Sequence, residues 1–377
     1  MASKHLLLVA NDPQSFLQFR LVVARQAREA GFEVSVATGP GAGAQRIRDQ
    51  GLAFYRLPMA AAGNRPLADL YTMLYLGWLF WRLRPDLVHL VTTKPVIYGG
   101  LMARLTRVPA MVAAVAGLGY LFTRERQGLR RWLVERLYPL ALHHPNSTVI
   151  VQNRADQDVL NSLGALPNGR AVLSPGSGVS LETFKAAPLP AGPATVLLAA
   201  RMTWDKGVGE FVDAARQLQG EGVAARFVLV GDDNVPNPSA IPRATLNRWV
   251  DEGIVEWWGY QSDMPAVMRQ STLVVLPSYR EGMAKALLEG LATGRPIITT
   301  DAPGCREAVD DGWNGLIVPP GDVAALASAI DALVKDPARC QLMGERSRQK
   351  AEAAFDVRRV IDIHLGVYRE LANRCPA

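Results

Sequence analysis

The segment that most constrains the fold of this chain runs from Thr272 to Thr300 and changes its hydrophobic period twice. Thr272–Leu276 has the length and apolar character of a buried parallel strand. After a polar elbow, apolar residues recur at helical spacing: Ala284, Leu287, Leu288 and Leu291. Gly294 and Pro296 end that helix, and a second apolar strand follows at once. A strand, elbow, helix and strand in this order predict a unit of a parallel α/β sheet, with the elbow at the ligand-binding edge.

The rest of the chain repeats this alternation twice, which predicts two doubly wound α/β domains. In the first series we expect strands near residues 6–10, 33–38, 54–57, 86–91, 111–115, 148–152 and 171–173, with helices near 16–30, 44–50, 67–83, 98–106 and 153–163. The second series begins at Thr195, with further strands near 227–231, 255–258, 273–276, 297–299 and 316–318. Three prolines between Ala186 and Pro193 mark a linker. We therefore predict one domain over residues 1–185 and a second over 186–356.

Charge and cysteine content narrow the class of partner. The net charge of +6 and the pI near 9.3 suit an anionic ligand or an acidic membrane surface. Nucleic acid is not expected, because the chain has no zinc-ligand spacing and no basic-aromatic repeat. The three cysteines show no metal spacing, and an odd number argues against a disulfide framework, so a reducing cytoplasm is expected.

Two motifs in the second series resemble those of glycosyltransferase family 4, whose members have the GT-B fold of two Rossmann-like domains facing across a cleft. Glu281-Gly282 with Glu289 resembles the family's E-x7-E motif, and Arg201 with Lys206-Gly207 resembles its R-x4-K-G motif. An arginine fork and a lysine point charge at a strand end suit a diphosphate. The resemblance implies that Arg201 and Lys206 bind the diphosphate of a nucleotide sugar.

The same resemblance assigns the other donor contacts and the course of the chain end. Glu281 faces the donor sugar with Gly282, Met283 and Ala284 nearby, and Glu289 binds the ribose hydroxyls; a solvated Glu289 is the alternative. Gly259 and Tyr260 flank the nucleotide base, although a turn glycine and a packed tyrosine would give the same pattern. The family transfers sugar with retention and generally needs no metal or other cofactor. Its final helix returns to the N-terminal domain, which residues 357–377 are expected to do.

The N-terminal domain is expected to bind the acceptor. Residues 11–15 replace the Gly-Gly loop of many family members. Residues 16–20, 92–95 and 117–123 resemble the branch that acts on polyprenyl-diphosphate-linked sugars in bacterial glycan assembly. The residues taken from these segments as acceptor-binding are Asn11, Ser15, Arg20, Lys94, Gly117, Gly119 and Tyr120. Lys94 is expected to bind the acceptor diphosphate, with an ordinary exposed lysine as the alternative. His89, inside a strand pattern, is expected to be buried and hydrogen-bonded rather than a metal ligand.

Two segments suggest peripheral attachment to the inner face of the plasma membrane. Leu70–Trp81 is apolar and aromatic but too short to cross a bilayer, and arginines are interleaved with apolar residues between Arg124 and Arg136. Each segment alone is more typical of a buried helix or a solvated face. The interpretation that follows is a retaining transferase that moves a hexose or N-acetylhexosamine from a UDP-sugar to a lipid-linked sugar. A soluble acceptor, a UDP-sugar 2-epimerase of the same fold and a non-catalytic binding protein are the alternatives.

Overall fold

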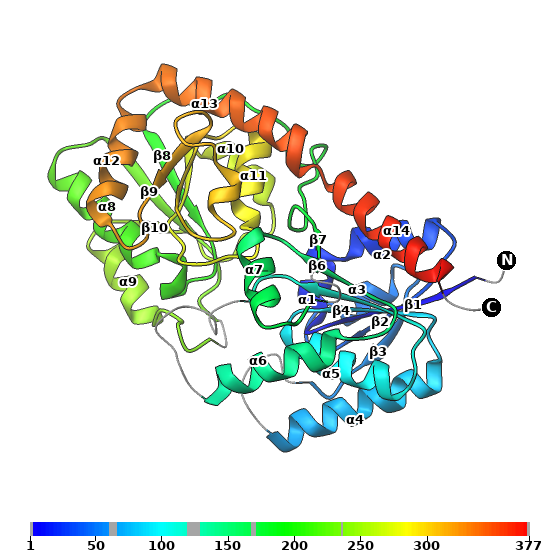
Figure 1. Ribbon diagram of the computed structural model, residues 1–377. Coiled ribbons are helices and arrows are strands. Elements are labelled where there is room, and N and C mark those ends of the chain that lie inside the picture. The colour runs from blue at the N-terminus through cyan, green and yellow to red at the C-terminus, as the bar shows by residue number, and fades with distance from the viewer. Residues whose placement is uncertain (1–2, 60–65, 119–128, 167–170, 235–236, 375–377) are drawn as a thin grey trace. The chain divides into compact units, whose positions relative to one another are not determined.

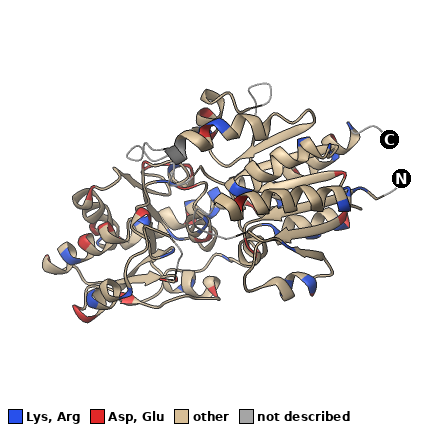
Figure 2. Cartoon of the chain, turned by 90° about the horizontal axis from the view of Figure 1, so that it is seen from below, with Lys and Arg blue, Asp and Glu red and all other residues tan. Residues whose placement is uncertain are grey.

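The computed structural model describes residues 3–59, 66–118, 129–166, 171–234 and 237–374, and of residues 129–131 it describes the backbone alone. The chain forms two compact units, one of residues 1–177 with 359–377 and the other of residues 178–358 (Figure 1). Lysines and arginines are interspersed with acidic residues along the elements of each unit (Figure 2). No helix in the described ranges is both long and apolar enough to cross a membrane.

The first unit is built on a parallel sheet of seven strands in the order β3-β2-β1-β4-β5-β6-β7. Its strands are β1 (His5–Ala10), β2 (Glu33–Thr38), β3 (Ala53–Arg56), β4 (Leu87–Val91), β5 (Ala110–Val115), β6 (Ser147–Val151) and β7 (Val172–Leu173). Its helices are α1 (Pro13–Phe19), α2 (Leu21–Glu29), α3 (Ala44–Arg48), α4 (Pro66–Leu83), α5 (Thr93–Leu105), α6 (Leu129–Leu142), α7 (Arg154–Ser162) and α14 (Val357–Asn373), which begins in the second unit.

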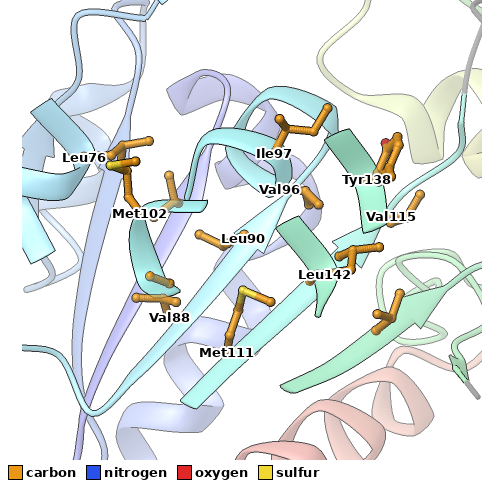
Figure 3. Packing of buried hydrophobic residues seen from close by; sticks show 14 of the residues in the cluster. Leu76, Val88, Leu90, Val96, Ile97, Met102, Met111, Val115, Tyr138 and Leu142 are labelled. Carbon is orange, nitrogen blue, oxygen red and sulfur yellow. The ribbon is translucent and has the colours of Figure 1, made fainter. Parts of the chain in front are cut away.

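Alternate residues of the first sheet point into two separate hydrophobic cores. On one face, Val88, Leu90 and Met111 pack against α4, α5 and α6, and Figure 3 shows Leu76 of α4 and Met102 of α5 in this layer. On the other face the sheet packs against α1, α2, α3 and α14. The prediction that the final helix returns to the N-terminal domain is therefore confirmed.

The second unit has a parallel sheet of six strands in the order β10-β9-β8-β11-β12-β13. Its strands are β8 (Ala194–Ala199), β9 (Ala225–Val230), β10 (Glu256–Trp257), β11 (Leu273–Leu276), β12 (Ile297–Thr300) and β13 (Gly315–Val318). Its α-helices are α8 (Val208–Gly220), α9 (Arg243–Asp251), α10 (Met264–Gln270), α11 (Lys285–Thr293), α12 (Val323–Val334) and α13 (Pro337–Lys350). In both units the chain leaves the central strand in one direction and then returns to its other side, so the predicted fold class of two doubly wound α/β domains is confirmed.

Two local features differ from the sequence interpretation. The helix expected over 16–30 is two helices, because the backbone leaves helical geometry at Arg20 (φ −129°, ψ −14°), which ends α1 and precedes α2. The proline-rich stretch expected to separate the domains lies inside the second unit, and the division falls between Ser177 and Gly178. Buried Arg295 explains this position, since its guanidinium donates to the carbonyls of Ala187 (2.8 Å) and Pro188 (3.1 Å) and holds the stretch to that unit.

Candidate functional site

The elbow that follows β11 is held in place by the loop that follows β12. The Glu281 N–H donates to the Pro303 carbonyl at 2.8 Å, and the Ala284 N–H donates to the Gly304 carbonyl at 3.0 Å. Gly304 has φ +78°, and a Cβ built there would lie 2.3 Å from the Glu281 carbonyl oxygen. Only glycine fits this left-handed and crowded position, so Gly304 fixes the backbone that carries Glu281.

A second loop brings Lys206 to the same elbow. After β8 the chain makes one 3₁₀ turn over Trp204–Lys206 and ends it at Gly207, with φ +72°. A Cβ at Gly207 would lie 2.1 Å from the Pro277 carbonyl oxygen, which shows how closely the two loops pack. The glycine therefore allows the lysine loop and the elbow to approach each other.

Lys206 and Glu281 form an ion pair in which Nζ lies 2.6 Å from Oε1. Their side chains are only 11% and 16% exposed, so the pair is mostly withdrawn from water. Asp205 adds a weaker contact to the same ammonium at 3.9 Å. Two predicted motifs, separated by 75 positions in the sequence, are thus joined by one short charged hydrogen bond.

Arg201 follows β8 but is not part of this pair. Its side chain is exposed and, among the residues that the structure describes, it makes no ion pair. A guanidinium held at a strand end without a carboxylate partner suits an anionic ligand. The structure thus separates the two predicted diphosphate ligands into one paired lysine and one exposed arginine.

Glu289 lies in α11 and is buried, with 6% of the residue exposed. Burial raises the pKa of this carboxyl to about 7, and Lys285, whose Nζ lies 3.6 Å away, offsets part of the rise. The alternative of a solvated Glu289 is therefore wrong. A buried carboxyl group with a pKa near 7 can accept hydrogen bonds from ligand hydroxyls once it is ionised.

The remaining donor candidates lie around these groups in different environments. Gly282 and Met283 are half-buried in the elbow, and Ala284 is buried where it precedes α11. Gly259 has φ +66°, and its carbonyl accepts the Gly231 N–H at 2.9 Å, so it joins two strand ends. Tyr260 is 64% exposed, so it is not the packed tyrosine considered as an alternative.

The acceptor candidates after β1 are partly engaged in local structure. Asp12 caps α1, accepting from the Ser15 N–H at 2.8 Å and from its hydroxyl at 2.7 Å. Ser15 therefore stabilises the helix start. Asn11 is half-buried, and its side-chain Oδ1 has no hydrogen-bond partner in the described structure.

The other acceptor candidates also differ from one another. Lys94 lies in the first turn of α5 and pairs with Asp69 of α4 at 3.0 Å, so it is not an ordinary exposed lysine. Arg20 is 3% exposed and therefore lies inside the unit. Gly117 is half-buried after β5, with φ +96°. The predicted contacts of Gly119 and Tyr120 fall outside the described residues.

The apolar segment of α4 is buried on one side and exposed on the other. Thr72, Leu76 and Phe80 face the core. We call the opposite side the α4 stripe: it consists of Leu67, Leu70, Tyr71, Leu74, Trp78 and Trp81, which are 42–84% exposed. Steps of three and four residues align these side chains along one helix face.

An arginine guanidinium lies over a tryptophan ring in α4, next to the stripe, and another does so in α6. Arg82 stacks on Trp78, with 5.2 Å between the guanidinium carbon and the ring centroid, and Arg136 lies 5.8 Å from Trp132. The beginning of the second predicted segment, residues 124–128, falls outside the described residues. The described part of the chain contains no group of three or more His, Cys, Asp or Glu side chains that could hold a metal ion.

The sequence interpretation did not identify the contribution of the loop after β12. The contact of Gly304 with the elbow could not be read from sequence spacing alone. The same loop contains Cys305, which is buried, and burial raises the pKa of its thiol to about 12. This thiol packs among the buried apolar residues of the second unit and is poorly suited to act as a nucleophile.

Comparison with known proteins identifies both halves of the chain. Residues 193–336 match the family model described as "Glycosyl transferases group 1", and residues 5–153 match "Glycosyl transferase 4-like". The chain is 28% identical over 338 residues to a Campylobacter jejuni protein named N,N'-diacetylbacillosaminyl-diphospho-undecaprenol alpha-1,3-N-acetylgalactosaminyltransferase, covering 85% of this chain and 87% of that protein.

Solved structures share the fold at lower sequence identity. Anabaena HepE in complex with UDP superimposes with a TM-score of 0.76 at 19% identity, covering 98% of this chain and all of that one. A glycosyltransferase from Rickettsia africae gives a TM-score of 0.80 at 17% identity, covering 99% of this chain and all of that one.

Proposed function

Because this chain belongs to the family 4 glycosyltransferases of the GT-B fold, we propose that it transfers a hexose or N-acetylhexosamine from a UDP-sugar to a polyprenyl-diphosphate-linked sugar, with retention. The observation that carries the proposal is the ion pair of Lys206 with Glu281 at the elbow after β11. It assembles a cation and a carboxylate where a diphosphate and a sugar would meet. The name of the Campylobacter relative, a transferase acting on a diphospho-undecaprenol sugar, supports this acceptor class.

The charges around the elbow suit departure of a diphosphate. In the proposed reaction the bond from the sugar C1 to the diphosphate oxygen breaks, and a bond from C1 to the acceptor oxygen forms on the same face. The acceptor proton passes to the departing diphosphate. Lys206 and Arg201 stabilise the negative charge that develops there, which is the largest usual catalytic contribution.

Glu281 and Glu289 have different tasks in this proposal. Glu281, positioned by the Pro303 and Gly304 backbone, accepts hydrogen bonds from the donor sugar hydroxyls. Glu289, with its pKa near 7, accepts from the ribose hydroxyls in its ionised form. Ligand entry requires Lys206 to exchange its contact with Glu281 for the diphosphate. We propose that these steps need no metal ion, so an excess of chelator should leave the rate unchanged.

We also propose that the α4 stripe attaches the protein to the cytoplasmic face of an anionic bilayer, beside its lipid-linked acceptor. Exposed Trp, Tyr and Leu side chains on one helix face, with arginines nearby, are what an interfacial helix requires. Lys94 of α5, which pairs with Asp69 of α4, lies in the unit that would receive the acceptor diphosphate. The α4 stripe thus supplies the membrane contact that a lipid-linked acceptor demands.

The transferase proposal is tested by UDP release from a panel of UDP-sugars, with and without a polyprenyl-diphosphate-linked sugar in detergent. We expect acceptor-dependent release from one donor, reduced by about 100-fold or more in Glu281→Gln. Equal release with a soluble sugar would favour the soluble-acceptor alternative. Interconversion of the UDP-sugar with no UDP release would favour the epimerase. Release that is unaffected by the substitution would refute the donor site.

The membrane proposal is tested separately by co-sedimentation with vesicles of neutral or anionic phospholipid. We expect binding to anionic vesicles to be lost in the double variant Leu74→Ser/Trp81→Ser and kept in Leu342→Ser, which removes a similarly exposed leucine from the second unit. Equal binding by the two variants would contradict the assignment of the α4 stripe.

A further inference from the structure

A buried polar cluster joins α14 to the first sheet, outside the candidate donor site. It consists of Arg20 between α1 and α2, His89 in β4, and His364 and Tyr368 in α14. All four are buried, with at most 3% of each residue exposed. A ring nitrogen of His89 lies 2.6 Å from the Tyr368 hydroxyl, and the two histidine rings are 5.4 Å apart.

The Arg20 guanidinium has almost no compensation for its burial. Within the described residues it makes one hydrogen bond, from Nη1 to the Phe19 carbonyl at 3.0 Å, and no ion pair. Its Nε has no partner. Because a buried charge is costly unless it is paired, this arrangement is expected only where an anion completes it.

His364 presents a complementary group. Its Nδ1 lies 2.7 Å from the Val360 carbonyl, which can only accept, so Nδ1 carries the ring proton. The other nitrogen, Nε2, is buried without a partner and has a free lone pair. Burial, together with the Arg20 charge, lowers the pKa of His364 to about 3, so the ring is neutral near pH 7.

The side chains of Arg20 and His364, each with one unpartnered nitrogen, line one small pocket at the carboxyl ends of β5 and β6. Gln152 and Ser174 add polar groups to its wall. Its free space is about 170 Å³ when the open mouth is counted, but the interior is too narrow for a water molecule. A ligand must therefore enter from the open side and displace a wall side chain.

We propose that Arg20 and His364 form a binding site for a phosphate group that carries one proton, either inorganic phosphate or a phosphate monoester. An anionic oxygen accepts from Arg20 Nε–H, and the P–OH donates to His364 Nε2. A sulfate has the same shape but no proton to donate near pH 7. The site therefore discriminates between two tetrahedral anions by a hydrogen atom.

Proton balance sets the pH dependence. Arg20, His89 and Tyr368 are the titratable groups that face His364. Burial lowers the pKa of His89 and raises that of Tyr368, so neither changes charge between pH 6 and 8. The second pKa of a phosphate monoester is about 6, so monoester binding should strengthen as the pH falls from 8 to 6, whereas inorganic phosphate keeps at least one proton throughout this range and its binding should change little.

The experiment is calorimetric titration of the whole chain, without donor, using inorganic phosphate and using sulfate at equal ionic strength. We expect inorganic phosphate to bind about tenfold or more tightly than sulfate at both pH 6 and pH 8, whereas a phosphate monoester should bind best at pH 6. Glucose 1-phosphate in a second titration distinguishes a monoester site from a site for free phosphate. Equal affinity for phosphate and sulfate would overturn the proposal without any variant.

Three variants separate binding from folding. Arg20→Met and His364→Asn should each weaken phosphate binding by about tenfold or more, whereas Arg25→Gln, a charge loss on the exposed side of α2, should not. Because Arg20→Met removes an uncompensated buried charge, it should also melt at or above the wild-type temperature in sulfate buffer. Phosphate binding by Arg20→Met at wild-type strength would refute the site. The titrations contain no sugar donor, so their outcome is independent of the proposed transfer.

Discussion

The ion pair of Lys206 and Glu281 allows its contribution to folding stability to be measured separately from its contribution to activity. Replacing Lys206 by Met removes the ammonium that pairs with the mostly buried Glu281 carboxylate, and replacing Glu281 by Gln leaves the mostly buried Lys206 ammonium with its weaker contact to Asp205 at 3.9 Å. Each loss should cost about 1–3 kcal/mol of unfolding free energy. In a unit of this size that lowers the melting temperature by about 2–12 °C.

The double variant Lys206→Met/Glu281→Gln removes both charges and should recover much of this loss. We expect a coupling free energy of about 1–3 kcal/mol, because the two atoms lie 2.6 Å apart at low exposure. Activity should not recover, since both proposed ligand contacts are gone. All three variants should therefore lose about 100-fold or more in the rate of UDP release.

The assay is thermal unfolding of the donor-free protein, followed by UDP release on the same samples. Lys335→Met is the matched control, because it breaks an exposed pair with Asp331 in the same unit and should change stability by less than about 0.5 kcal/mol. Additive losses in the double variant would refute the ion pair. A double variant that regained activity would refute the assignment of these residues to the donor.

Three further predictions concern the second unit. Burial raises the pKa of Glu289 from 4.5 to about 7, so the protonated form that stabilises the folded protein is lost as the pH rises through 7. Glu289→Gln should therefore melt at a higher temperature than wild type at pH 8. In the same variant, the affinity for UDP, measured by calorimetry, should rise less between pH 6 and pH 8 than it does in wild type. Arg295→Met should lower the unfolding free energy by about 3–5 kcal/mol in urea titrations, because it removes four hydrogen bonds from a buried guanidinium to backbone carbonyls. Gly304→Ala should cost more stability than Gly312→Ala, since both have positive φ but only the first Cβ would strike Glu281, so equal melting temperatures would contradict the packing of the elbow.

The repeating order of elements was predictable because parallel α/β units carry two distinct hydrophobic periods. The strands and helix around the elbow, at 272–300, agree closely with β11, α11 and β12. The break at Arg20 was not predictable, since residues 16–30 keep helical spacing through it. What separates α1 from α2 is tertiary, because Arg20 is drawn into the cluster with His364 of a helix more than 300 positions away.

In the candidate site, too, some features were predictable from the sequence and others depend on tertiary contacts. The resemblance to the family 4 motifs identified Lys206 and Glu281, and both follow parallel strands, whose carboxyl ends share one edge of a sheet. Their direct pairing depends on Gly207 and Gly304, whose close contacts are with backbone atoms of other loops. The burial of Glu289 was also invisible, since a glutamate off the apolar stripe of a helix is usually solvated.

The central claim is transfer of one sugar to a lipid-linked acceptor, and mass spectrometry of the lipid product tests it most directly. The acceptor lipid is incubated with the UDP-sugar that gave acceptor-dependent release, and the linkage of the purified product is read by NMR. We predict a lipid that is heavier by one hexose or N-acetylhexosamine residue, with the anomeric configuration of the donor. Consumption of the donor with free sugar as the only product, or a lipid carrying the opposite configuration, would contradict it.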